Sequence, residues 1–304
     1  MPDDHAISAA AAAIKRTIGA ETVDPEATVA SDRRAWIDAV ADVALSAGTR
    51  ERVEHIGGVP CRWVAPTSGD APAVIVYAHG GGLVAGSPVT HREFASRLAL
   101  ATRCPVLLVD YRLLPEHGIA EPIDDVVAVH RALTADAGRE PTRVLFAGDS
   151  SGAGLMVAAL AALRDAGDPL PAGLISFSGA FDATLSSRSI DEGRDPQLHR
   201  GALEHWQDVV RDVVRLDDAR LSPLFGALHG LPPVLLLAGG DEVWRDDSIR
   251  LARGLAAGGG TVELHVVGGM WHVWPMWGSF PEATEALERA AAFVRATATP
   301  PRRA

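Results

Sequence analysis

Short runs of apolar residues alternate with amphipathic segments over most of this 304-residue chain. Six runs rich in Val, Ile and Leu are typical of strands that are covered on both faces, namely Val74–Tyr77, Val106–Val109, Val144–Phe146, Leu174–Phe177, Val234–Leu237 and Val262–Val267. Helical spacing is found between them in His91–Thr102, Ile123–Ala135, Gly154–Arg164, Asp247–Ala257 and Glu282–Thr297. This alternation predicts an α/β fold, with a mostly parallel central sheet flanked by helices.

The region before this alternation has a different pattern. Arg52–Ile56 and Pro60–Val64 alternate apolar and polar residues close together, which predicts an antiparallel hairpin. Helical spacing over residues 25–47 predicts N-terminal helices, and Gly48 is a plausible stop signal for the last of them.

One connection, from Ala180 to Leu231, is too long for a simple crossover between strands. Loops of that length inside a compact domain are usually functional lids. We therefore expect N-terminal cap helices in residues 1–47, a catalytic domain in residues 48–304, and a cap insertion at about 180–231. Both cap segments are expected above the C-terminal edge of the sheet.

Composition excludes several classes of function. The net charge of −11 repels phosphate backbones and anionic lipids, so neither nucleic acid nor a membrane is an expected partner. The two cysteines, Cys61 and Cys104, lack the spacing of a zinc site, and their small number favours a reducing compartment. With an acidic N-terminus at Met1–Asp4 and no apolar stretch of about 18 residues, we expect a cytoplasmic protein.

The pentad Gly148-Asp149-Ser150-Ser151-Gly152 has the pattern G-x-S-x-G. It lies between a predicted strand and a predicted helix, the context that places a serine on a sharp strand-to-helix turn. Glycines at both ends relieve backbone crowding, and the helix N-terminus favours developing negative charge. The pattern predicts Ser150 as a nucleophile, with a plain glycine-rich turn as the alternative.

A run of three glycines, in His79-Gly80-Gly81-Gly82, follows another predicted strand. Because glycine has no Cβ, the backbone N–H groups of Gly81 and Gly82 can approach a substrate oxygen, and Ser151 N–H would be a third donor. These three residues are the expected oxyanion hole. A phosphate-binding loop is the alternative, but the chain lacks its Lys-Ser/Thr ending and the G-x-G-x-x-G continuation.

The base and its orienting acid should follow the nucleophile in the order Ser, Asp/Glu, His. Asp241 follows one predicted strand and His272 follows the next, so both are expected at the sheet edge near Ser150. His272 would take the serine proton, and Asp241 would hold the imidazole in the right tautomer. The rival acids are Glu242, Asp246 and Asp247.

These residues resemble the hormone-sensitive lipase family of α/β-hydrolases, in its bacterial branch of small esterases with a GDSAG-type pentad. The resemblance runs from about residue 30 to residue 297, and its markers are His79–Gly82, Asp110–His117, Gly148–Gly152, Asp241 and His272. It implies a helical cap, a Ser150/Asp241/His272 triad, and hydrolysis of carboxylic esters with short to medium acyl chains. The chain departs from the family pattern at Ser151, where Ala is usual, at Ala153, and at Asp241-Glu242-Val243, where Asp-Pro-Leu is usual.

Tryptophans supply the candidate substrate pocket, because aromatic side chains commonly line pockets for apolar ligands. Trp271, Trp274 and Trp277 cluster around His272, and Trp36 and Trp206 lie on the two cap segments. We expect Trp36, Trp206, Trp271 and Trp274 to line the pocket. Simple packing of the last helix or between cap helices is the alternative.

The sequence thus predicts a serine carboxylesterase that acts on a small-molecule ester. An amidase, formamidase or lactonase on the same scaffold is one alternative. A ligand-binding or dehydratase-like protein that has lost hydrolysis is another, since fold does not fix function. Neither a cofactor nor a metal is expected, because no H-E-x-x-H motif occurs and the 11 histidines are scattered. A homodimer is left open.

Overall fold

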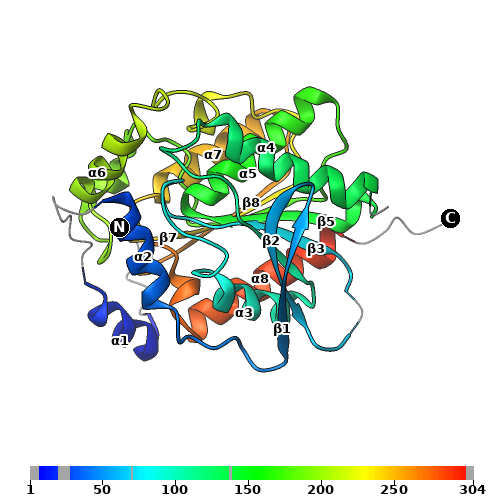
Figure 1. Ribbon diagram of the computed structural model, residues 1–304. Coiled ribbons are helices and arrows are strands. Elements are labelled where there is room, and N and C mark those ends of the chain that lie inside the picture. Colours follow the sequence, from blue (N-terminus) through cyan, green and yellow to red (C-terminus); the bar gives the residue numbers. More distant parts are fainter. Residues whose placement is uncertain (1–6, 20–27, 70, 137–138, 299–304) are drawn as a thin grey trace.

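An eight-stranded sheet runs through the centre of the molecule, in the order β1-β2-β4-β3-β5-β6-β7-β8 (Figure 1). The computed structural model describes residues 7–19, 28–69, 71–136 and 139–298. The strands are β1 (Thr49–Ile56), β2 (Val59–Pro66), β3 (Val74–Ala78), β4 (Val106–Val109), β5 (Val144–Asp149), β6 (Leu174–Phe177), β7 (Val234–Gly239) and β8 (Val262–Val267). β2 pairs antiparallel with β1 and β4, and all other pairs are parallel. The predicted α/β fold with a mostly parallel central sheet is confirmed.

Helices cover both faces of the sheet (Figure 1). α3 (Arg92–Thr102) and α8 (Pro281–Thr297) pack on one face, and α4 (Ala120–Arg131), α5 (Ser150–Ala166) and α7 (Arg245–Ala257) pack on the other. Every residue of β3 to β7 is therefore buried, which is why those strands read as continuous apolar runs. Short helical segments are η1 (Ala132–Asp136), η2 (Pro141–Arg143), η3 (Arg188–Glu192), η4 (Pro223–Phe225) and η5 (Trp274–Trp277).

The two N-terminal helices lie in different places. α1 (Ala9–Thr17) packs beside α8, where Ser8 at its N-terminus hydrogen-bonds to Glu282. α2 (Val29–Ala39) instead lies near α6 (Arg200–Val210), on the left of Figure 1. Residues 1–6 and 20–27 of the expected N-terminal segment, including Met1–Asp4, are outside the described residues. The expectation that Gly48 ends a helix is wrong: α2 ends at Ala39, and Gly48 lies in the turn before β1.

Arg33 links α2 to the loops that follow β3 and β4. Its guanidinium donates to the backbone oxygens of Val84 at 2.6 Å and Leu114 at 2.8 Å, and pairs with Glu116. Because Val84 follows the glycine run, this side chain links α2 directly to the loop that is expected to bind the oxyanion.

The segment at about 180–231, which we expect to be a cap insertion, is linked to α7 by a buried carboxylate. Asp247 accepts hydrogen bonds from the backbone N–H groups of Phe181 and Asp182, both at 2.8 Å, and from the Ser187 hydroxyl. Burial raises the pKa of Asp247 to about 7, although the hydrogen bonds from Ser187 and Phe181 oppose the shift. The start of the insertion is thus held by polar contacts inside the fold.

No helix in the described ranges is long and apolar enough to cross a membrane. The cytoplasmic location stays a prediction.

We expect Gly152→Ala to lower the free energy of unfolding by about 1–3 kcal/mol or more, because a Cβ there would meet the carbonyl oxygens of Ala78 and His79. Gly201→Ala, in α6, is the matched control: its Cβ meets only the His199 ring at 3.4 Å, and alanine favours the helix by up to about 1 kcal/mol. Urea unfolding of both variants measures the difference. Equal stabilities would contradict the close approach of α5 to β3.

Candidate active site

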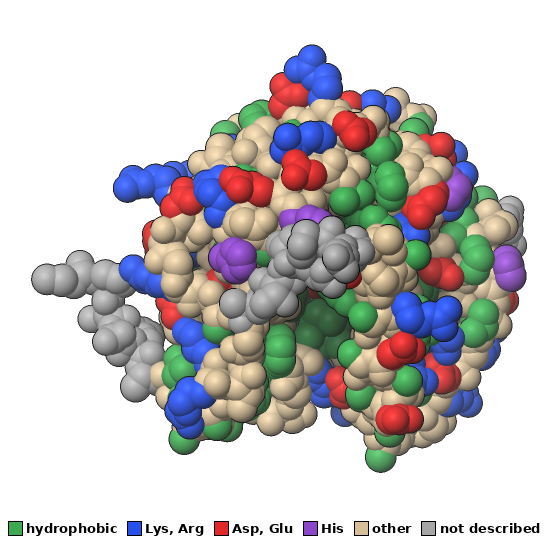
Figure 2. Space-filling view, turned by 60° about the vertical axis from the view of Figure 1, so that its left-hand side comes forward, with side chains coloured by type: hydrophobic (Ala, Val, Ile, Leu, Met, Phe, Trp, Pro, Cys, Tyr) green, Lys and Arg blue, Asp and Glu red, His purple; other side chains and the backbone are tan. Residues whose placement is uncertain are grey.

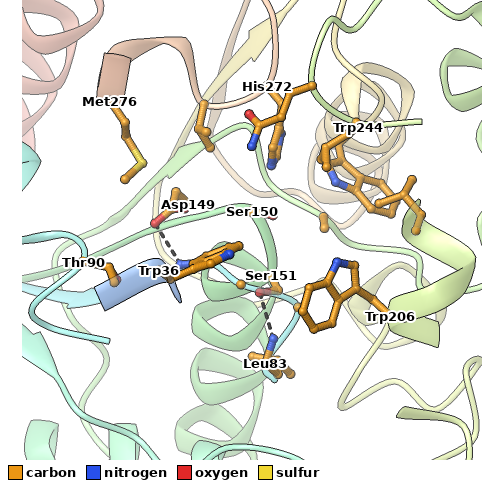
Figure 3. A pocket seen from close by; sticks show the side chains of 18 of the residues that line it. Trp36, Leu83, Thr90, Asp149, Ser150, Ser151, Trp206, Trp244, His272 and Met276 are labelled. Atoms are coloured by element: carbon orange, nitrogen blue, oxygen red, sulfur yellow. Dashed lines mark hydrogen bonds between the residues drawn. The ribbon is translucent and has the colours of Figure 1, made fainter. Parts of the chain in front are cut away.

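Ser150 occupies the turn between β5 and α5 in a strained backbone conformation. Its φ of +50° lies in the left-handed region that side chains with a Cβ rarely adopt. The turn is tight because α5 approaches the preceding strand closely: a Cβ on Gly148 would lie 2.7 Å from the carbonyl carbon of Gly152. This geometry presents Ser150 to a cavity at the end of the sheet (Figure 3).

The glycine run forms the loop that faces Ser150. Gly81 and Gly82 have φ values of +118° and +65°, and both line the cavity. Neither of their N–H groups has a hydrogen-bond partner among the described residues. The Ser151 hydroxyl accepts a hydrogen bond from Leu83 N–H at 3.2 Å, which ties the loop to the first turn of α5 (Figure 3). The arrangement therefore offers free backbone donors beside the serine.

A buried carboxylate holds this loop from below. Asp149 Oδ1 accepts from the Tyr77 hydroxyl at 2.8 Å and from Gly80 N–H at 3.0 Å, and His91 Nε2 lies 3.3 Å away. Burial raises the pKa of Asp149, but His91 and the hydrogen bonds outweigh it, so that its pKa is below the usual value. A charged Asp149 with these contacts on Oδ1 fixes Gly80 relative to the turn.

His79 braces the same loop. Its ring stacks on Tyr111 with centroids 4.3 Å apart, and the Tyr111 hydroxyl donates to the His79 carbonyl oxygen at 2.6 Å. Burial, assisted by the charge of His91, lowers the pKa of His79 to about 3, so the imidazole stays neutral.

His272 is buried in the loop after β8, and its imidazole points into the cavity above Ser150 (Figure 3). The nearest carboxylate is that of Glu242, whose Oε2 lies 3.9 Å from Nδ1. This separation exceeds a hydrogen bond, but neither Nδ1 nor the Glu242 oxygens have another partner within the described part of the chain. Catalytic hydrogen bonds are often long before substrate binds.

Asp241, the acid expected from the sequence, does not reach His272. Its carboxylate points the other way and accepts from Lys15 Nζ at 2.6 Å, with Arg194 at 3.9 Å. Adjacent residues after a strand point to opposite sides, and the inward side belongs to Glu242, which is 1% exposed. The expectation that Asp241 orients His272 is therefore corrected by the geometry.

The other two rival acids also have different partners. Asp246 binds the guanidinium of Arg245 at 2.9 Å and accepts from Ser189 N–H, and Asp247 holds the start of the cap insertion. Glu242 is thus the carboxylate that the fold directs at the imidazole Nδ1.

Burial and charge act against each other at His272. Burial lowers the pKa of His272, but the Glu242 carboxylate raises it, with smaller contributions from Asp195 and Asp149, and the net shift is upward. Burial likewise raises the pKa of Glu242, against the pull of His272. A protonated His272 is therefore stabilised by its surroundings, as a general base requires after it accepts a proton.

The cavity around Ser150 has a volume of about 520 Å³. Trp36 from α2 and Trp206 from α6 line it, as expected. Two further tryptophans that we did not expect there, Trp244 and Trp277, also line it. On the face where α2 and α6 lie, hydrophobic side chains gather in a hollow of the surface (Figure 2).

Trp271 and Trp274 do not line this cavity, so the sequence-based expectation for them is wrong. Both are fully buried with α3 and α8 in the core on one face of the sheet, where Trp271 stacks on Phe280 with centroids 5.8 Å apart. Trp271 precedes His272 in the sequence, yet its side chain packs in the core while that of His272 lines the cavity. The alternative of simple packing applies to these two.

Within residues 7–19, 28–69, 71–136 and 139–298, no group of three or more His, Cys, Asp or Glu side chains could hold a metal ion. The cavity combines a strained serine, free backbone N–H donors and a buried histidine, and these are the groups that acyl transfer uses.

Comparisons with known proteins agree with this geometry. The family described as alpha/beta hydrolase fold matches residues 75–276. An acetyl-hydrolase of Streptomyces hygroscopicus is 38% identical over 81% of this chain and 83% of its own length. An esterase of Acinetobacter venetianus is 37% identical over 73% and 75%. The crystal structure of an esterase from the bacterial hormone-sensitive lipase family superposes with a TM-score of 0.86, at 34% identity, over 91% of this chain and 94% of that one.

We expect Trp271→Ala to lower the free energy of unfolding by about 3–5 kcal/mol, because it empties a fully buried site. Trp277→Ala, at a position that is 38% exposed on the cavity wall, should lower it by less than half as much. Thermal unfolding of both variants compares the two tryptophans. A larger loss for Trp277 would contradict their placement.

Proposed function

This chain belongs to the bacterial hormone-sensitive lipase family of alpha/beta hydrolases and is a carboxylic ester hydrolase, and we propose that it works through a Ser150–His272–Glu242 triad. The observation that carries the proposal is the meeting of Ser150, His272 and the free N–H groups of Gly81 and Gly82 at one cavity. Glu242 takes the role of the acid because its carboxylate is the one that faces Nδ1.

The proposed reaction has two halves. Ser150 Oγ attacks the ester carbonyl while His272 Nε2 accepts the serine proton, and Glu242 stabilises the imidazolium that results. The negative oxygen of the tetrahedral intermediate binds the N–H groups of Gly81, Gly82 and Ser151. His272 then protonates the departing alcohol, and a water molecule hydrolyses the acyl-enzyme by the same steps in reverse order.

The cavity favours neutral substrates of limited size. Its lining is mainly apolar, and the charged groups in it, Asp149 and His272, already have the roles described above. We propose small to medium acyl chains, with acetyl esters as the first candidates because the Streptomyces hygroscopicus relative is an acetyl-hydrolase. Trp36 and Trp206 support a cap made of α2 and the insertion at about 180–231, which would set the acyl size.

We expect a fluorophosphonate probe to add once to the protein and to abolish hydrolysis of p-nitrophenyl esters. Ser150→Ala should prevent the labelling and lower kcat by about 10⁶-fold, because the nucleophile is gone. Mass spectrometry measures the labelling. Hydrolysis is measured with a chain-length series of p-nitrophenyl esters, an arylformamide and a lactone. Ser186→Ala, in the expected cap insertion, is the control variant, and the probe should still label it. Undiminished labelling of Ser150→Ala would contradict the proposal.

We expect Glu242→Gln to lower kcat by about 10³–10⁴-fold, because the imidazole loses its orienting charge. Asp241→Asn should lower kcat less than about tenfold, since its partner is Lys15. In the wild type, kcat/KM should rise with pH around a midpoint above 6.5, because the pKa of His272 is raised and the base must be unprotonated. Steady-state kinetics test all three statements. A crippled Asp241→Asn beside an active Glu242→Gln would restore the original assignment.

A further inference from the structure

Asp195 connects the cap insertion to the loop that carries His272. It lies between η3 and α6, and its Oδ2 accepts a hydrogen bond from the backbone N–H of His272 at 3.0 Å. Its other oxygen, Oδ1, accepts from the backbone N–H groups of Gln197 at 2.9 Å and Leu198 at 3.1 Å. One carboxylate therefore binds two segments that are more than 70 residues apart in the sequence.

Both segments reach the cavity. Gln197 and Leu198 line it from the cap, and His272 lines it from the sheet edge. A carboxylate that only shaped its own turn would need no more than the two contacts of Oδ1. The bond from Oδ2 to His272 is additional, and it makes the position of the imidazole depend on the position of the cap wall.

The loop that carries His272 is also bound to the end of the sheet. Val273 donates its backbone N–H to the Ser178 hydroxyl at 2.9 Å, at the end of β6. Consecutive N–H groups of the loop thus bind one acceptor from the sheet and one from the cap. Because Val273 is in the left-handed region, these two bonds stabilise a backbone that would otherwise relax.

The charge of Asp195 also acts on the imidazole. The charged groups that face His272 are Glu242 from the loop before α7, Asp149 from the end of β5, and Asp195 from the cap, with His91 beside Asp149. Burial lowers the pKa of His272, and the three carboxylates raise it. Arg194, the neighbour of Asp195, is directed at Asp241 and Glu192 instead.

We propose that Asp195 is a positioning residue for the esterase reaction, one that couples the seating of the cap insertion to the placement and protonation of His272. The proposal rests on the proposed function, since it assumes that His272 is the general base. When the cap wall formed by Gln197 and Leu198 is in place, the carboxylate fixes the imidazole over Ser150. When that wall shifts, His272 loses both a backbone bond and a negative charge.

The test is the pH dependence of kcat/KM and kcat for Asp195→Asn and Asp195→Ala, with p-nitrophenyl acetate as substrate. Asparagine keeps an oxygen for the His272 N–H but removes the charge, so the midpoint of the acid limb should move down by about 0.5 pH unit or more. Alanine should give the same shift and also lower kcat on the high-pH plateau, because the backbone bond is lost. If only one of the two variants folds, that variant is enough to test the shift of the acid-limb midpoint.

Asp191→Asn is the matched control, because its carboxylate lies in the same insertion and pairs with Arg200 at 2.6 Å. Its acid limb should stay at the wild-type midpoint. An unmoved midpoint in the Asp195 variants, or an equal shift in Asp191→Asn, would overturn the proposal. Failure of the proposed function itself is distinguishable, because hydrolysis would then persist in Ser150→Ala.

Discussion

The turn at Ser150 is the constraint on which the other features of the site depend. Its left-handed backbone is tolerated only because Gly148 and Gly152 let α5 approach the sheet without a Cβ between them. Asp149, buried directly before the serine, uses the same turn to hold Gly80. The positions of the proposed nucleophile and of the proposed oxyanion loop are thus set by one piece of backbone, which gives the preorganisation that ester hydrolysis requires.

The remaining groups of the site come from loops after the strands and from the expected cap. Glu242 and His272 follow β7 and β8, and the Glu242 carboxylate raises the pKa of the buried His272. Arg33 links α2 to the loop that follows β3, and Asp195 links the segment before α6 to the backbone of His272. The elements that we expect to shape the substrate pocket are therefore connected by these polar contacts to the residues that we propose for catalysis.

The fold could be predicted from the sequence because every strand of the sheet's interior is covered on both faces and reads as an apolar run. Ser150 and Gly81 could be predicted because the close backbone approaches around them require glycines, at Gly148, Gly152 and in the loop, and this pattern is visible in the sequence. The choice between Asp241 and Glu242 could not, since it depends on which side chain turns inward after β7, a matter of tertiary packing. Trp271 was misplaced for the same reason: proximity in sequence to His272 did not reveal that its side chain turns into the core.

The most direct test of the account is a crystal structure of the protein inactivated by a phosphonate ester. The account predicts phosphorus bonded to Ser150 Oγ, with the phosphoryl oxygen within about 3.2 Å of the N–H groups of Gly81 and Gly82. It also predicts that Glu242 closes from 3.9 Å to hydrogen-bond distance of His272 Nδ1. An adduct on another residue, or a carboxylate other than Glu242 bonded to Nδ1, would contradict it.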